Sequence, residues 1–579
     1  MNEAKTPVMG AVLLALALAS VALSSSSFLG VLAPEHLHPT AAGPAVFILL
    51  LLAEGALLTA FARVSYHEAV TQLGACALPF LLLLAGFHWV PFSGAEGLVY
   101  PDRQMGAVMG VAWMLHLSLF ASCLAYRALA RGKRTIPAAF LAASLVLFGG
   151  SALQTTRCEL SGDEPHYLLM AYSLIHDGDL DLSNNYDNHH AEAFYKRGIL
   201  EPQGNEHLLP NGKRYSHHPL GPVLLILPGF LVASRLGASL TVAVLAALCL
   251  SLALRAFLAF GAKPSVVEKA GWAGLFVSPL LLYAGLVFAE VPTALALSIA
   301  LWCLATRRYG ALGAALGLLL WMHNRNVLLV IPSILAALAA AKDGKLAGRD
   351  FGRMALGFAL PVIPLAIYFN GIYGAVSPLA AHNEAFGSLF SLPRFVINFP
   401  GLLMDQESGL WFTLPLSAAV PAGVVLGARK GGAFKAAAFA LLAYWAAMCF
   451  YQNLGLQPPA RYFAGVTPLI LLCLLPVFER LEGAAPAWRR LVVTLAGMST
   501  FMNLTLSAVP WLKFNPLTGQ NRLLDFGGRL LHLPLNSWEP SFLDPNALTR
   551  SLVLSLFWMS VAAALTFGFV RDARGRDRS

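Results

Sequence analysis

The residues best suited to chemistry stand together at the start of a polar segment, residues 157–219. Asp163 and Glu164 are adjacent carboxylates in the sequence Gly-Asp-Glu-Pro-His-Tyr, and a carboxylate can take a proton from an attacking hydroxyl group. Beside a second acid and near lipid, the pKa of Asp163 should be raised toward neutral pH. We therefore predict that Asp163 is a catalytic base and that Glu164 supports it or helps to hold a metal ion. The structural alternative, that Asp163 only caps a helix, is about as strong.

Two arginines and a pair of histidines are the candidates for binding a phosphate group. Arg325 and Arg461 each stand alone at the end of an apolar run, and a guanidinium group offers paired donors to phosphate. The alternative is that each of them reaches toward lipid headgroups. His217 and His218 close the polar segment and could bind phosphate or carry protons, although a histidine in a loop more often does neither.

Three further acids, Glu290, Asp405 and Glu407, could orient an acceptor or pair with the arginines. We place them, with the arginines and the histidines, among the substrate-binding candidates. The alternating aspartates of residues 177–181 resemble a calcium loop, but Leu182 stands where that loop needs glycine, which excludes an EF-hand. No metal ligands are assigned, and dependence on a divalent cation stays open.

The first element that must position these groups is a helix beginning at Asp163. Asp is a good N-cap, Pro165 suits a first turn, and apolar residues from Tyr167 to Ile175 recur at helical spacing. The helix is predicted to lie along the membrane surface, apolar side down, with the acid pair at the lipid boundary. Later in the same segment, Pro-Asn-Gly between short half-apolar runs predicts a β-hairpin over residues 206–216.

Composition decides the class of protein. Of 579 residues, 57% are hydrophobic and 12% are charged, which excludes an ordinary soluble protein. Many segments have the roughly 20 apolar residues that a helix needs to cross a membrane. The net charge of +9 comes largely from basic residues in short loops between spans, a pattern typical of cytoplasmic loops rather than of nucleic-acid binding. Most cysteines lie inside apolar segments, so no disulfide framework is expected.

We predict an all-α polytopic membrane protein with about 16 transmembrane helices and both termini in the cytoplasm. The number of spans depends on the apolar run 219–232. If this run is interfacial or re-entrant, most of the basic loops lie on the cytoplasmic side, and if it crosses the membrane they do not. Every candidate residue then falls on the outer face, where loops 374–410 and 511–550 are expected to cover the site. The predicted spans are 8–32, 43–64, 67–90, 105–129, 135–155, 237–260, 268–288, 291–306, 309–323, 325–341, 354–373, 411–428, 436–453, 462–479, 491–510 and 551–570.

The acid motif Gly162-Asp-Glu-Pro-His-Tyr in the first large outer loop, followed by His217-His-Pro-Leu, resembles the GT-C superfamily of glycosyltransferases. Members such as protein O-mannosyltransferases and lipid A aminoarabinose transferases use polyprenyl-phosphate-linked sugars. The resemblance implies a GT-C-like core over 135–510, with outer-face helices in the loop 157–218. It leaves a four-helix extension at 1–134, and a cap loop, last span and basic tail at 511–579. By the same resemblance, Asp163 would be the catalytic acid of the family motif.

The function implied is inverting transfer of a sugar from a polyprenyl-phosphate donor to a hydroxyl group of a lipid, glycan or protein acceptor. The reaction would take place on the extracytoplasmic face of the plasma membrane, with Arg325 and Arg461 steadying the phosphate. No further cofactor is assigned, and nucleic acid is not an expected partner. A transporter or lipid flippase of envelope glycan precursors is the alternative, but it predicts charged residues near mid-membrane rather than at helix ends. A non-catalytic partner in envelope assembly would bind no donor.

Overall fold

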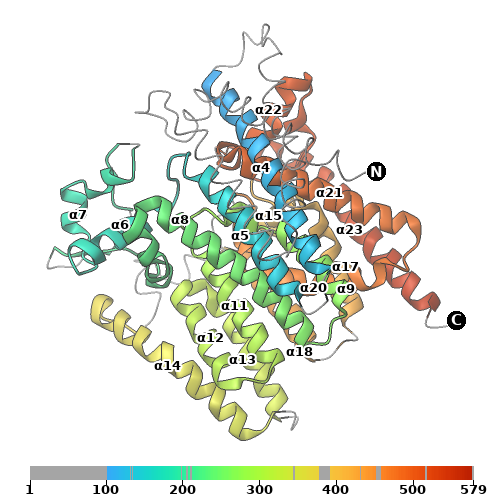
Figure 1. Ribbon diagram of the computed structural model, residues 1–579, viewed down its shortest axis with the longest axis horizontal. Helices are drawn as coiled ribbons and strands as arrows, with labels where there is room; N and C mark the ends of the chain where they lie inside the picture. The colour runs from blue at the N-terminus through green and yellow to red at the C-terminus, as the bar shows by residue number, and fades with distance from the viewer. Residues whose placement is uncertain are drawn as a thin grey trace, which may run out of the picture.

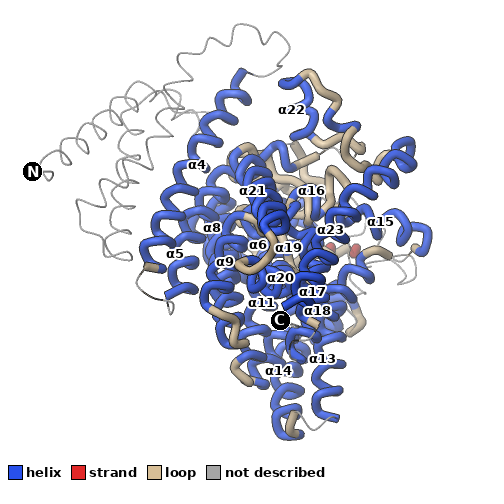
Figure 2. Tube along the Cα trace, turned by 90° about the vertical axis from the view of Figure 1, so that its right-hand side faces the viewer, coloured by secondary structure: helices blue, strands red, loops and turns tan. Residues whose placement is uncertain are grey.

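The computed structural model describes residues 101–576, apart from 131, 133–134, 197, 204–206, 209–211, 343–345, 377–390, 429, 431, 451–457 and 516–517. The predicted spans 8–32, 43–64 and 67–90 lie outside the described residues. Helices make up most of the described chain, and its two strands pair only with each other (Figures 1 and 2). The predicted all-helical class is therefore correct for this part of the chain.

The first half of the described chain packs around α5 and α8. α4, which the sequence assigns to the N-terminal extension, lies beside α5 in both views and also contacts α21 (Figures 1 and 2). α14 packs against α12 at the edge of the bundle (Figure 1). The helices of this half are α4 (Pro101–Leu129), α5 (Ile136–Thr155), α8 (Leu220–Ala259), α9 (Pro264–Phe276), α10 (Leu280–Tyr283), α11 (Glu290–Ala305), α12 (Tyr309–Met322), η3 (Asn324–Asn326), α13 (Val327–Lys342) and α14 (Gly348–Tyr373).

The polar segment between α5 and α8 folds into small elements of its own. They are α6 (Glu164–His176), α7 (Ser183–Asp187), η2 (His190–Ala193), β1 (His207–Leu208) and β2 (Arg214–Tyr215). The two strands pair antiparallel, with His207 opposite Tyr215, so the predicted hairpin is confirmed. α6 and α7 gather on one side of the molecule, beside α8 (Figure 1).

The second half is more interrupted. Its elements are α15 (Leu392–Met404), α16 (Leu410–Thr413), η6 (Pro415–Ala419), α17 (Val420–Gly427), α18 (Gly432–Met448), α19 (Arg461–Ala464), α20 (Thr467–Leu481), α21 (Pro486–Ala508), η7 (Pro510–Lys513), α22 (Arg522–Leu531), η8 (Leu535–Ser537), η9 (Pro545–Ala547) and α23 (Leu548–Arg576). The predicted span 411–428 is not one helix, because it is divided between α16, η6 and α17. Pro415 and Pro421 begin new turns there, because proline donates no backbone hydrogen bond and blocks the preceding helical turn.

Seven helices of the described residues are long and apolar enough to cross a membrane. They lie within 110–129, 136–155, 220–259, 264–283, 348–373, 486–508 and 548–572. These helices fit a multi-pass membrane protein. Other apolar helices of the described part, including α11, α12 and α18, have 10–17 residues, so the larger predicted number of spans stays a prediction.

The apolar run after the polar segment turns back on itself. Within α8 the backbone leaves the helical conformation at Ala233 and Ser234, and Ser234 has a φ of 47°. A Cβ added at Gly229 would meet the carbonyl oxygen of Gly237 at 2.3 Å, although eight residues of straight helix span about 12 Å. The chain therefore reverses here, and the residues before the kink form a separate helix. The interfacial or re-entrant placement of the run 219–232 stays a prediction.

Candidate functional site

Four charged side chains, two of them buried and two partly exposed, form a continuous cluster. The guanidinium group of Arg461 donates to the carboxylate of Asp163 and, through Nε, to Oε1 of Glu290 at 3.0 Å. Arg325 donates from Nη2 to the same Oε1 at 2.5 Å. The side chains of Glu290 and Arg461 are 0% and 6% exposed, whereas that of Asp163 is 24% exposed. The cluster is electrically neutral, and Asp163 is its most open member.

Helix ends and breaks bring these four residues together. Asp163 immediately precedes α6, and Glu290 is the first residue of α11. Arg325 lies in η3, the short turn between α12 and α13. Arg461 begins the four-residue helix α19. A side chain at the end of a helix is not enclosed by the next turn of the same helix. Side chains from four distant parts of the sequence can therefore contact one another at these helix ends.

The turn before Arg461 is held in an uncommon conformation. Ala460 has a φ of 58°, which is rare for a residue with a Cβ. Its amide donates to the carbonyl oxygen of Ser408 at 2.9 Å. The buried hydroxyl group of Tyr283 donates to the carbonyl oxygen of Pro458 at 2.7 Å. These two contacts fix the backbone that aims Arg461 at the acids.

Asp163 occupies the N-cap position of α6, but its side chain forms no capping hydrogen bond. The helix begins through its backbone instead, since the carbonyl oxygen of Asp163 accepts from the amides of His166 and Tyr167 at 3.1 and 3.2 Å. The carboxylate is left to contact Arg461. The alternative that Asp163 only caps the helix therefore does not explain the position of its carboxylate.

The pKa of Asp163 is lowered, which corrects the sequence prediction that it is raised. Burial of the carboxyl group opposes ionisation, but the positive charge of Arg461 and its hydrogen bond to the carboxylate outweigh burial. The sequence prediction took account only of lipid and of the adjacent acid. In this arrangement Asp163 is ionised at neutral pH and is a weak base.

Glu164 does not contact the arginines of the cluster. Its side chain is buried, Oε1 accepts from the amide of Val287 at 3.0 Å, and Oε2 accepts from the amide of Ser161 at 3.4 Å. Burial raises the pKa of Glu164, and the charges of Arg235 and Lys513 partly oppose that rise. Glu164 thus fastens the start of α6 to the turn before α11 and positions Asp163.

The first half of α6 is not a surface helix. Every residue from Glu164 to Ala171 is buried, because this half inserts beside α8 and the turn before α11. Only the end of the helix, near His176, is exposed. The prediction of a helix lying flat with one face open is therefore wrong for the half that carries the acids.

The histidines lie beside Asp163. The buried ring of His218 has its centroid 4.8 Å from that of Tyr167, 5.7 Å from that of His166 and 4.2 Å from that of His217. Burial, followed by the effect of His217, holds the pKa of His218 well below its usual range, so this ring is neutral. Its Nε2 atom has no hydrogen-bond partner among the described residues. A neutral imidazole with such a nitrogen can bind a hydroxyl group.

Sequence reasoning missed the aromatic rings that pack on the arginines. The guanidinium carbon of Arg461 lies 4.5 Å from the ring centroid of Phe288, and that of Arg325 lies 5.5 Å from the ring of Tyr462. Tyr444 of α18 also forms a hydrogen bond with Arg325. Phe288 and Tyr462 each stand within two positions of a charged candidate, which was the only signal available in the sequence.

Asp405 and Glu407, which the sequence suggests as substrate-binding residues, are engaged elsewhere. Both are 0% exposed. Asp405 accepts through Oδ2 from the amide of Phe542 at 2.7 Å, and the carboxylate of Glu407 accepts from the amide of Gly519. They fasten the segment 511–550 to the bundle. The carboxylates that pair with Arg325 and Arg461 are those of Glu290 and Asp163.

Asp405→Asn is expected to lower the free energy of unfolding by about 2 kcal/mol, because an amide nitrogen would face amide donors that the carboxylate now accepts. The change is measured by thermal or chemical unfolding of the purified protein in detergent. Asp525→Asn is a matched control, since Asp525 pairs with Arg529 on the exposed face of α22. Equal unfolding midpoints for the two variants would contradict an anchoring role for Asp405.

Lys513 forms a second buried polar contact near Glu164. Its Nζ donates to Oγ1 of Thr155 at 3.1 Å and to the carbonyl oxygen of Leu282 at 3.2 Å. Burial lowers the pKa of Lys513 from 10.5 to about 8, although Cys158 and Glu164 partly oppose this shift. The folded chain therefore releases this proton at a lower pH than the unfolded chain.

Stability is expected to rise as the pH increases from about 8 to 10.5, because in this range the unfolded chain still binds the Lys513 proton. The gain is on the order of 3 kcal/mol. Unfolding midpoints measured across this range in the wild type and in Lys513→Met check it, with the exposed Lys435→Met as control. The prediction fails if Lys513→Met shows the same rise as the other two proteins.

Among the described residues, no group of three or more His, Cys, Asp and Glu side chains is arranged to hold a metal ion. The aspartates of 177–181 are used within their own loop. Asp181 accepts through Oδ1 from the amide of Arg214 at 3.0 Å, and Asp177 accepts from the side-chain amide of Asn185 at 2.7 Å.

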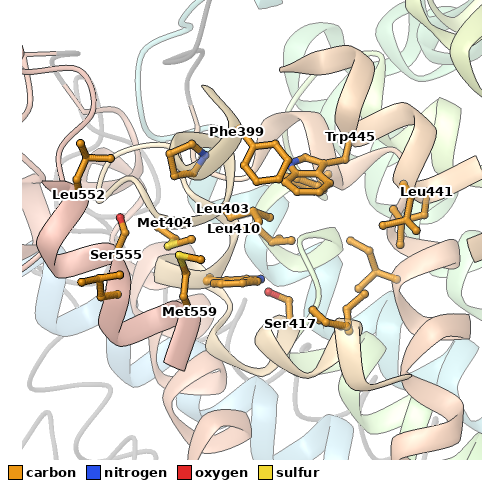
Figure 3. A pocket seen from close by; sticks show the side chains of 18 of the residues that line it. Phe399, Leu403, Met404, Leu410, Ser417, Leu441, Trp445, Leu552, Ser555 and Met559 are labelled. Atoms are coloured by element: carbon orange, nitrogen blue, oxygen red, sulfur yellow. The ribbon is translucent and has the colours of Figure 1, made fainter. Parts of the chain in front are cut away.

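A large apolar groove begins beside α19. It has a volume of about 650 Å³ and is bounded by α15, α16, η6, α17, α18, α20 and α23 (Figure 3). Phe463, two residues after Arg461, is part of its wall. The outer wall is open, since Leu556 and Met559 of α23 are 59% and 53% exposed. Trp445 and Phe399 pack against each other at its edge, with ring centroids 4.4 Å apart and ring planes tilted by 40°.

No protein-family model, curated protein or solved structure matches this chain. The arrangement of the described residues is therefore the ground on which a function can be argued.

Proposed function

We propose that the chain is an inverting membrane glycosyltransferase of the GT-C type. It moves a sugar from a polyprenyl-phosphate donor to a hydroxyl group of a lipid, glycan or protein acceptor. The site works on the extracytoplasmic face of the plasma membrane. Asp163 is the base, and Arg325 and Arg461 hold the phosphate.

The observation that carries this proposal is that the short helix α19 joins the charge cluster to the apolar groove. Arg461 begins α19, and Phe463 of the same short helix lines the groove. A polyprenyl phosphate needs both features at one place, because its head is an anion that guanidinium groups bind and its tail is hydrocarbon. Snorkelling to headgroups, the alternative for a lone arginine, does not explain why Arg461 is 6% exposed and paired with two acids.

The reaction needs one proton acceptor and one group that stabilises the leaving phosphate. Asp163 takes the proton of the acceptor hydroxyl as the oxygen attacks the anomeric carbon from the side opposite the phosphate. The bond between the anomeric carbon and the phosphate oxygen breaks, and its electron pair leaves with polyprenyl phosphate. Arg461 and Arg325 stabilise that anion. Glu290 has a second oxygen, Oε2, that is buried without a hydrogen-bond partner among the described residues and is suited to a sugar hydroxyl.

The test uses the lipids of the producing cell, so the sugar need not be known beforehand. Purified protein is reconstituted in vesicles made from those membrane lipids, and free polyprenyl phosphate is measured by mass spectrometry. The wild type is expected to release polyprenyl phosphate as the sugar-linked lipid disappears. Movement of the intact sugar-linked lipid across the vesicle membrane, with no release, would instead establish the flippase.

Narrowing the groove is expected to weaken binding of a long-chain donor. Met559→Trp places a larger ring in the groove, and binding of farnesyl phosphate should fall by about tenfold because less hydrocarbon is buried. Phe557→Trp, on the exposed side of the same helix, is the control. Calorimetric titration in detergent measures both variants, and equal affinities would remove the groove from the donor site.

A further inference from the structure

We propose that Arg461 holds Asp163 in an inactive ion pair until the phosphate of the donor takes over the guanidinium group and releases the carboxylate. This inference rests on the proposed function, and it adds that binding of the donor switches on the base. Asp163 is then the catalytic residue, and Arg461 both binds the phosphate and controls the base.

The contacts show which partner Arg461 is able to exchange. Glu290 is 0% exposed and binds Arg461 and Arg325 through the same oxygen, so it stays in place and keeps the two guanidinium groups together. Asp163 is 24% exposed and forms its only ion pair among the described residues with Arg461. An anion arriving from the open side therefore meets the Asp163 contact first.

The charge of the cluster explains why an incoming phosphate displaces a carboxylate. Two arginines and two carboxylates make a neutral cluster, so an added phosphate needs a cation, and Arg461 can supply it only by loosening one carboxylate. A phosphate offers several oxygens to a guanidinium group and matches its paired donors. The ring of Phe288 lies 4.5 Å from the guanidinium carbon of Arg461 and supports the group while its partners change.

The released carboxylate is a stronger base for two reasons. It loses the cation that lowers its pKa, and it gains the negative charge of the phosphate nearby. The other groups that face Asp163 are His166, His217, His218 and Tyr167. Burial lowers the pKa of His166 to about 4 and that of His218 well below its usual range, and it raises the pKa of Tyr167 well above its usual range, so these three groups remain uncharged at neutral pH.

The order of events makes proton transfer depend on donor binding. The acceptor proton passes to Asp163 only after Arg461 has moved to the phosphate, as the acceptor oxygen forms its bond to the anomeric carbon. The bond from that carbon to the phosphate oxygen breaks, and the phosphate keeps the electron pair beside Arg461. Without donor, the base stays neutralised by its ion pair, and no proton is taken from water or from an acceptor.

The test is an infrared titration of the Asp163 carboxyl group, identified by its loss in Asp163→Asn, with and without farnesyl phosphate. In the wild type, farnesyl phosphate is expected to raise the pKa of Asp163 by at least about 1. In Arg461→Gln, the pKa should already be raised without ligand, and farnesyl phosphate should change it little. If Arg461→Gln does not fold, the titration of the wild type with and without farnesyl phosphate tests the proposal by itself.

The outcomes separate the two proposals. Binding of farnesyl phosphate with an unchanged titration of Asp163 overturns the exchange and leaves the proposed function standing. Absence of binding by the wild type, tested by calorimetry in the same detergent, overturns both. Binding together with the raised pKa supports both.

Discussion

Asp163→Asn is expected to lower the rate of sugar transfer by about a thousandfold, since an amide cannot accept the acceptor proton. The side chain keeps its shape, and Arg461 keeps its contact with Glu290, so the fold is expected to persist. The rate is measured as polyprenyl phosphate released per protein molecule in vesicles, with folding checked by the unfolding midpoint. Affinity for farnesyl phosphate should not fall, because the substitution removes a competitor for Arg461 rather than a ligand contact.

Asp187→Asn is the matched control for this prediction. Asp187 is an exposed acid of the same polar segment, residues 157–219, and lies outside the charge cluster. It should transfer sugar at the wild-type rate. A similar rate in Asp163→Asn would remove this carboxylate from the mechanism, and the base would have to be sought at His218, whose Nε2 has no partner among the described residues.

Glu290→Gln is expected to lower the free energy of unfolding by about 3–5 kcal/mol, because it leaves two buried guanidinium groups without the carboxylate they share. Arg325 would lose the ion pair at 2.5 Å, and Arg461 would keep only Asp163. The loss is measured from unfolding midpoints in detergent. Farnesyl phosphate should restore part of the stability, since it supplies negative charge at the same place.

The control for Glu290→Gln is Glu479→Gln, which removes an ion pair of similar length in an open setting. Glu479 pairs with Lys430 at 2.6 Å, and both side chains are at least a third exposed. Water replaces the lost partner there, so the unfolding midpoint should not move measurably. If Glu290→Gln is equally neutral, the buried cluster does not hold α11, η3 and α19 together.

Local sequence patterns predicted several elements because their causes are local. The helix begins at Glu164 as Pro165 suggests, and the two short strands that flank the Pro-Asn-Gly sequence pair antiparallel. The same patterns did not predict that the first half of α6 is buried all round. That burial comes from α8 and from the turn before α11, more than a hundred residues away in the case of Val287.

Three acids show which part of the site the sequence could not predict. Glu290, Asp405 and Glu407 look alike in sequence, each lying next to an apolar run. In the fold, Glu290 binds two arginines, whereas Asp405 and Glu407 bind backbone amides of the segment 511–550. Which partner a carboxylate receives depends on contacts between distant segments, and a single sequence carries no signal for them.

By itself, the sequence determined that the described chain is helical, that its long apolar segments fit a multi-pass membrane protein, and that the candidate residues stand at helix ends, because hydropathy and helix signals act over short distances. Only the tertiary structure decided which charges meet and in which direction the pKa of Asp163 moves. The proton affinity of a carboxyl group depends on the charge a few ångströms away, and that charge belongs to Arg461, which lies 298 positions along the chain.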